Sequence, residues 1–221
     1  QTACAVGTYQ VATGQTSCTP AAVGNYVDKT GQDQQIACLA GTYNANTGSN
    51  SSNACVKALA GFYVASMGQS VQTKCAAGTY QVATGQSSCD DAAVGHYVDK
   101  TGQDQQTECL AGTYNANTGS NSSSACLDAD AGSYVGQKGQ SVQTACAVGT
   151  YQETTGQTSC DECAAGTYNA NTASTTSSAC VKALAGFYVD QKGQSVQTAC
   201  AVGTYQVATG QTSCTPAAVG N

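Results

Sequence analysis

Fourteen cysteines fall on one internal repeat, and their spacing limits the possible folds more than any other feature of the chain. The motif is C-x-x-G-x-Y, then x-x-x-x-G and a closing cysteine, as in Cys4, Gly7, Tyr9, Gly14 and Cys18. Other units keep both glycines and the tyrosine but have Ala and Gln in place of the two cysteines. Successive units of about 17 residues predict a tandem repeat array.

The whole chain, residues 1–221, is predicted to be a single continuous array and a fragment of a longer one, since residues 1–25 and 197–221 are identical. Cys4 to Cys75 and Cys75 to Cys146 both span 71 residues, whereas Cys146 to Cys200 spans 54. The difference, 71 − 54 = 17, is one whole Cys-free unit, which indicates that the unit is the structural module. The units begin at residues 4, 21, 38, 58, 75, 92, 109, 129, 146, 163, 183, 200 and 217.

The two cysteines of a unit are kept together or lost together. In the Cys-free units the replacing pairs are Ala21/Gln35, Ala58/Gln72, Ala92/Gln106, Ala129/Gln143 and Ala183/Gln197. This joint loss predicts that the two cysteines are disulfide partners. The expected disulfides are Cys4–Cys18, Cys38–Cys55, Cys75–Cys89, Cys109–Cys126, Cys146–Cys160, Cys163–Cys180 and Cys200–Cys214.

Disulfides and an oxidising compartment are favoured over zinc sites, because the only CxxC is Cys160–Cys163 and the only histidine is His96. We interpret this CxxC as the junction of two adjacent disulfide units rather than as a redox motif. No metal site is predicted. Asp28 and Asp33, which flank a turn, are a weaker alternative as calcium contacts.

Within a unit the pattern is typical of β structure. Tyr9 and Val11 alternate with polar residues, and Thr13-Gly14 is a turn signal, so we expect a small two-stranded hairpin closed at its base by the disulfide. The predicted fold class is an all-β, disulfide-rich tandem repeat of small β-hairpin units, stacked into an elongated solenoid-like array with essentially no helix.

Every tyrosine occupies the same position of its unit, and we expect the rings to form the repeat core between successive units. The alternative is a line of aromatic platforms that stack on sugars or bases. The tyrosines are Tyr9, Tyr26, Tyr43, Tyr63, Tyr80, Tyr97, Tyr114, Tyr134, Tyr151, Tyr168, Tyr188 and Tyr205.

Charged residues make up only 9% of the chain, and the net charge is −6. No basic face is available for nucleic acid, and no apolar run is long enough to span a membrane in this fragment. Self-association into filaments is expected, since few charges protect the open strand edges. The sequence implies no cofactor and no catalytic residue, because His96 has no second histidine to act with.

Two long Cys units contain an inserted segment with an N-glycosylation acceptor sequence, at Asn50-Ser51-Ser52 and Asn121-Ser122-Ser123. Asn50 and Asn121 are therefore glycosylation candidates, with an undecorated exposed turn as the alternative. A third insert, residues 172–178, is rich in Ser and Thr but lacks the acceptor.

The pattern C-A-V-G-T-Y-Q-V-A-T-G-Q-T-S-C at residues 4–18, together with Cys160-Asp-Glu-Cys163 joining two units, resembles the ephrin-receptor-like cysteine-rich repeats of the growth-factor-receptor group. The resemblance implies extracellular, stalk-like or adhesive modules of β hairpins without enzymatic activity.

Two functions fit these observations. The first hypothesis is an extracellular structural protein, secreted or at the cell surface, that forms or coats a filament. The alternative is the stalk or ligand-binding ectodomain of an adhesin or receptor. Nearly identical copies favour the first, because a specific binding site needs one unit to differ from the others.

Overall fold

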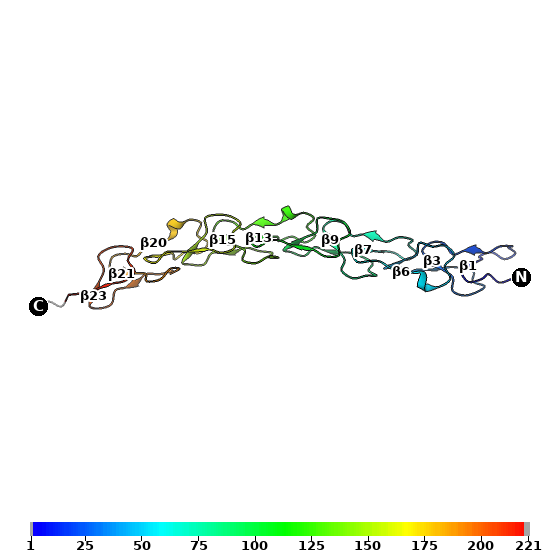
Figure 1. Cartoon of the computed structure of the whole chain (residues 1–221), viewed down its shortest axis with the longest axis horizontal. Helices are drawn as coiled ribbons and strands as arrows, with labels where there is room; N and C mark the ends of the chain where they lie inside the picture. The colour runs from blue at the N-terminus through cyan, green and yellow to red at the C-terminus, as the bar shows by residue number, and fades with distance from the viewer. Residues whose placement is uncertain (1, 219–221) are drawn as a thin grey trace. The chain divides into compact units, whose positions relative to one another are not determined.

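A computed structural model describes residues 2–218 as an all-β protein built from small antiparallel hairpins (Figure 1). The described residues form twelve such hairpins, one for each unit from that of Cys4 to that of Cys200. Each strand is only two residues long, well below the usual three to ten. The truncated unit that begins at Ala217 lies mostly outside the described residues.

The strand pairs follow one another in chain order. The first six are β1 (Thr8–Tyr9) with β2 (Thr19–Pro20), β3 (Asn25–Tyr26) with β4 (Ile36–Ala37), β5 (Thr42–Tyr43) with β6 (Val56–Lys57), β7 (Phe62–Tyr63) with β8 (Thr73–Lys74), β9 (Thr79–Tyr80) with β10 (Asp90–Asp91), and β11 (His96–Tyr97) with β12 (Thr107–Glu108). The next six are β13 (Thr113–Tyr114) with β14 (Leu127–Asp128), β15 (Ser133–Tyr134) with β16 (Thr144–Ala145), β17 (Thr150–Tyr151) with β18 (Asp161–Glu162), β19 (Thr167–Tyr168) with β20 (Val181–Lys182), β21 (Phe187–Tyr188) with β22 (Thr198–Ala199), and β23 (Thr204–Tyr205) with β24 (Thr215–Pro216).

The hairpin is placed differently from the expectation. Its second strand follows the closing cysteine, as Thr19 pairs with Tyr9 and Pro20 with Thr8, whereas we expected it to lie before Cys18. Val11 lies outside the strand and is exposed. The strand ends early because the Gln10 N–H turns to the next unit and donates to the Gln32 carbonyl, at 3.2 Å.

The inserts of the long Cys units form single turns of 3₁₀ helix. These are η1 (Ser52–Ala54), η2 (Ser123–Ala125) and η3 (Ser177–Ala179). At the start of η1, the Ser51 hydroxyl accepts a hydrogen bond from the Asn53 N–H, at 3.2 Å. Such local side-chain bonds favour turns over strands, so the insert ends the β pattern.

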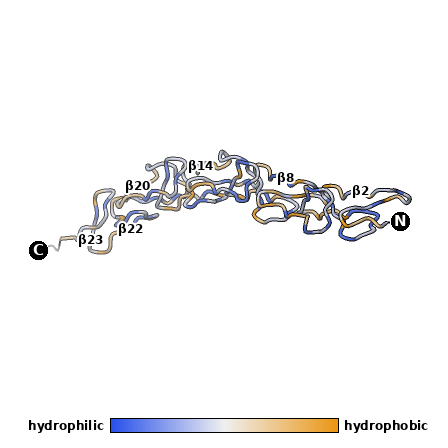
Figure 2. The backbone as a smooth tube through the Cα atoms, turned by 45° about the vertical axis from the view of Figure 1, so that its right-hand side comes forward, coloured by the Kyte–Doolittle hydropathy of each residue, from blue (hydrophilic) through white to orange (hydrophobic). Residues whose placement is uncertain are grey.

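The contacts within the chain define two compact parts. The first contains the residues through Ala93 together with Tyr97–Thr107 and Thr118–Ser123, and the second contains Val94–His96, Glu108–Asn117 and the residues from Ser124 onward. Neither part has one central hydrophobic core. Hydrophobic and hydrophilic stretches alternate along the tube instead, as Figure 2 shows.

Buried side chains are concentrated at two positions of the repeat. One is the first position, where Ala21 is 0% and Cys38 1% exposed. The other directly follows the tyrosine, where Val27 is 0% and Asn44 1% exposed. The small core is thus a repeated pair of side chains, and it recurs from unit to unit in both parts.

The structure places the tyrosines, which we expected to form the repeat core, at partly exposed positions. All are half-buried except Tyr205, which is 49% exposed. The two-residue strands are too short to enclose a ring on every side, so the rings cover the edge of the core and the smaller neighbours fill it.

Successive units are joined by backbone hydrogen bonds. In the first part, the Gly7 N–H donates to Val27 O at 2.8 Å, and the Gly31 N–H donates back to Cys4 O at 2.8 Å. The same bonds join the next pair, where Gly24 donates to Asn44 O and Gly48 to Ala21 O. Because a lone hairpin is marginal in water, these shared bonds explain how Cys-free units stay folded.

Candidate functional site

Seven disulfides close the Cys-containing units, each within one unit. The structure brings together every cysteine pair expected from the joint losses. They are Cys4–Cys18, Cys38–Cys55, Cys75–Cys89, Cys109–Cys126, Cys146–Cys160, Cys163–Cys180 and Cys200–Cys214. They span 14 residues in the short units and 17 in the long ones, and no described cysteine is free. In the chain-entropy model, loops of this size give roughly 3 kcal/mol each.

Cys-free units are closed by a glutamine side chain, a role that the sequence analysis did not assign. The Gln35 Oε1 accepts from the Ala22 N–H at 2.7 Å, and the Gln72 Oε1 accepts from the Leu59 N–H at 2.8 Å. Gln106, Gln143 and Gln197 make the equivalent bond, at 2.6 to 2.8 Å. The amide thus reaches back to the residue after the Ala that replaces the first cysteine.

Three residue types occupy the position after the tyrosine. Cys-free units have valine there, and long Cys units have asparagine. The Asn44 Nδ2 donates to Asn25 O of the previous unit at 2.9 Å and to the Ser49 Oγ at 2.8 Å, while its Oδ1 accepts from the Asn46 N–H at 3.1 Å. These bonds make up for the loss of hydration on burial.

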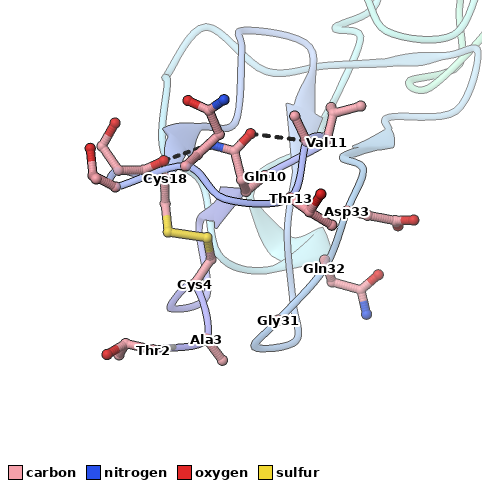
Figure 3. Close-up of a pocket in the computed structure, with 14 residues that line it drawn as sticks. Thr2, Ala3, Cys4, Gln10, Val11, Thr13, Cys18, Gly31, Gln32 and Asp33 are labelled. Atoms are coloured by element: carbon pink, nitrogen blue, oxygen red, sulfur yellow. Dashed lines mark hydrogen bonds between the residues drawn. A yellow bond between two sulfur atoms is a disulfide. The ribbon is translucent and has the colours of Figure 1, made fainter.

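In short Cys units the same position is glutamine. The Gln10 Nε2 donates to Ser17 O at 2.6 Å, and its Oε1 accepts from the Ala12 N–H at 3.2 Å. Figure 3 shows both bonds beside the Cys4–Cys18 disulfide. The glutamine therefore holds the loop that the disulfide closes.

The first glycine of the motif, here called the motif glycine, has a positive φ, and from Gly7 to Gly166 it has almost no free space. At Gly61 φ is 78°, and an added Cβ would lie 2.3 Å from the carbonyl oxygen of Gly102, two units further along. The second glycine, here called the turn glycine, also has a positive φ but more space, since a Cβ on Gly68 would lie 3.7 Å from the nearest atom. The motif glycine thus lets a unit contact the second unit after it.

Two exposed salt bridges join units of the second part. The Lys138 Nζ lies 2.6 Å from the Glu108 Oε2, and the Lys192 Nζ lies 2.7 Å from the Glu162 Oε2. The hydrogen bond from Lys138 lowers the pKa of Glu108 and raises that of Lys138. The bond to Glu162 likewise raises the pKa of Lys192.

Glu153 is joined to an insert rather than to a lysine. Its Oε1 accepts from the Ser177 N–H at the start of η3, at 2.6 Å, and this bond lowers the pKa of the carboxyl group. It is the one acidic residue at this position of a short Cys unit, where Val11, Val82 and Val207 stand in the others.

The remaining sequence candidates lie on the surface. Asn50 and Asn121 are exposed, each directly after the turn of its insert. Asp28 and Asp33 are also exposed. His96 is half-buried in β11, and its Nδ1 lies 2.9 Å from the carbonyl oxygen of Val94. No group of three or more potential metal ligands occurs among residues 2–218.

One hollow of the surface lies beside the first disulfide. It measures about 610 Å³ and is lined by residues of the first two units, among them Cys4, Gln10, Thr13 and Gln32 (Figure 3). It is open to solvent, and its only acidic lining residue is Asp33. The described chain contains no helix with the length and apolarity needed to cross a membrane.

Comparison with known proteins adds one family. Residues 132–180 match the family described as tyrosine-protein kinase ephrin type A/B receptor-like. The chain is a cysteine-rich repeat protein, and this segment of it is similar to the receptor-like family. The matched segment contains the CxxC junction at Cys160–Cys163, where two disulfide units adjoin without a Cys-free unit between them. No curated protein matches the chain.

Proposed function

We propose that the chain is an extracellular structural protein, secreted or at the cell surface, that forms or coats a filament and catalyses no reaction. The observation that carries the proposal is the repetition of one set of neighbour bonds. The motif glycines from Gly7 to Gly186 donate to the next unit and the turn glycines from Gly31 to Gly210 donate to the previous one, as Gly24 and Gly48 do. Every unit therefore offers its neighbours nearly the same surface, which suits an array of many copies stacked into an elongated solenoid.

The density of disulfides and the receptor-like match support an extracellular or cell-surface setting. Disulfides persist in oxidising compartments outside the cytosol, and there they would keep the units of a surface fibre closed. The proposal also includes glycans on Asn50 and Asn121, which are exposed and stand in acceptor sequences. Equal intact masses before and after enzymatic deglycosylation of native material would exclude the N-linked glycans.

The second candidate is the stalk or ligand-binding ectodomain of an adhesin or receptor. Its support is the family match over residues 132–180. In that case the segment with the CxxC, whose units differ most from the regular alternation, would be the part that binds.

Electron microscopy of native surface material, labelled with an antibody against the chain, separates the two candidates. Labelled fibres with a regular axial repeat are expected for the structural protein. Discrete labelled particles, or label spread evenly over the membrane without fibres, would contradict the filament and favour the ectodomain.

A further inference from the structure

One glycine of the described chain has no conformational reason to be a glycine. Among residues 2–218, every glycine has a positive φ except Gly136. A Cβ added to Gly136 would meet no described atom closer than Thr158 O, at 3.5 Å, which is an ordinary contact distance. Neither the backbone conformation nor the packing therefore excludes a larger residue at position 136.

The same glycine sets its unit apart from the other complete units. It lies two residues after Tyr134, where every other complete unit has a residue with a side chain. In the other Cys-free units these residues are Asp28, Ala65, Asp99 and Asp190. A Cβ at position 136 would lie 3.6 Å from Cε2 of the Tyr134 ring. Gly136 therefore leaves the ring uncovered at a point that a side chain would touch.

Two hollows of the surface adjoin at Gly136 and Gln137, which line both of them. The first measures about 250 Å³, and its lining includes Tyr134 and Val142. The second measures about 630 Å³, and its lining includes Leu110, which is 74% exposed. All of these residues belong to the second compact part. Because ligand sites combine apolar surface with a few polar groups, the ring and the two aliphatic side chains supply the larger share of such a site.

The polar groups of the two hollows favour a neutral ligand. Their only charged lining residues are Glu108 and Lys138, which form a salt bridge at 2.6 Å and so neutralise each other. Gln137 and Gln140 are exposed, and a glutamine amide offers both hydrogen-bond donors and an acceptor. A sugar matches this surface, because a sugar ring has an apolar face of C–H groups and a rim of uncharged hydroxyls.

We propose that the two adjoining hollows, here called the saccharide site, bind a neutral saccharide, with one sugar ring stacked on the face of Tyr134 that Gly136 leaves open. The amides of Gln137 and Gln140 bind its hydroxyls. Nucleic-acid bases also stack on aromatic rings, but their phosphates need cations, and Lys138 is already paired. The stacking role that the sequence allowed for every tyrosine is thereby confined to one unit. The site does not depend on whether the chain forms a filament.

The test is an NMR titration of the full 221-residue chain with neutral oligosaccharides of glucose, of mannose and of N-acetylglucosamine at millimolar concentrations. At least one of the three should shift the signals of the Gly136 amide and the Tyr134 ring. G136D introduces the residue that stands at the equivalent position 190. It should weaken binding roughly tenfold or more, because a carboxylate over the ring removes the stacking contact.

The unit of Tyr188 provides the converse variant. It has the equivalent salt bridge, between Lys192 and Glu162, but Asp190 in place of the glycine and Ala164 in place of the leucine. D190G/A164L should therefore create a second saccharide site, read at the signals of the Tyr188 ring.

Three results would overturn the saccharide site. They are the absence of any shift with all three sugars, equal affinity in G136D and the unsubstituted chain, and binding of an oligothymidine in place of the sugars. A D190G/A164L variant without the second site would show that the open ring is not what binds. None of these results changes the fibres expected in native material, so failure of the site and failure of the filament are distinguishable.

Discussion

The motif glycines allow the cost of backbone strain to be separated from the cost of a close contact between units in a single chain. Gly61 and Gly186 stand in the same sequence, VKALAGFYV, at residues 56–64 and 181–189. Their φ angles are 78° and 82°. A Cβ on Gly61 would lie 2.3 Å from Gly102 O, whereas a Cβ on Gly186 would have no atom of residues 2–218 within 4 Å. The pair differs in the contact to the second following unit and matches in backbone strain.

The expected costs of Gly→Ala follow from this difference. The left-handed conformation costs an alanine about 1–2 kcal/mol, and this applies to G61A and G186A alike. In G61A the backbone must also move away from Gly102, and such overpacking typically costs a further 1–3 kcal/mol. We therefore expect destabilisation of about 3 kcal/mol for G61A and about 1 kcal/mol for G186A.

Hydrogen exchange read by NMR provides a matched probe for each variant. The Cys75 N–H donates to Gly61 O and the Cys200 N–H donates to Gly186 O, both at 2.9 Å. A difference of about 2 kcal/mol corresponds to roughly 30-fold faster exchange at Cys75 in G61A than at Cys200 in G186A, each relative to the unsubstituted chain. Equal loss of protection would show that backbone strain dominates and that the contact between alternate units contributes little.

Three further predictions follow from the closures and the inserts. Replacing Cys75 by Ala and Cys89 by Gln should cost about 2 kcal/mol, because a loss of about 3 kcal/mol is offset by about 1 kcal/mol from an amide bond to the Ala76 N–H. In denaturant unfolding, C75A/C89A should cost the full amount of about 3 kcal/mol. Equal unfolding midpoints for the two variants would refute closure by glutamine. Ala173, at φ 53°, is the one described non-glycine residue with a positive φ. A173G should therefore raise the unfolding midpoint by the equivalent of about 1 kcal/mol, while A170G should lower it. A lower midpoint for A173G would contradict backbone strain at Ala173. The lowered pKa of Glu153 means that its bond to the Ser177 N–H stabilises the insert at neutral pH and is lost as the pH falls below about 4.5. The NMR shift of the Ser177 amide should therefore change with pH below about 4.5 in the unsubstituted chain and not in E153Q. A pH-dependent shift in both would refute the bond.

The sequence was sufficient for the unit length, the β character and the grouping of cysteines, because these follow from positions that repeat. The location of the second strand could not be predicted, because it depends on the bond from Gln10 to Gln32, which joins different units. The burial of Asn44 likewise depends on neighbours that a pattern within one unit does not contain. The closing role of the glutamines had a visible signal, since Gln replaces the second cysteine in every complete Cys-free unit.

The central claim is that every unit is closed on itself, and the junction at Cys160–Cys163 tests it most directly. There the nearest alternative partners lie side by side, and the segment 153–163 that contains Cys160 and Cys163 occurs only once in the chain, unlike the identical segments at residues 1–25 and 197–221. Peptide mapping of native material by mass spectrometry without reduction should find Cys146 linked to Cys160 and Cys163 linked to Cys180. Links from Cys146 to Cys163 and from Cys160 to Cys180 would contradict the account.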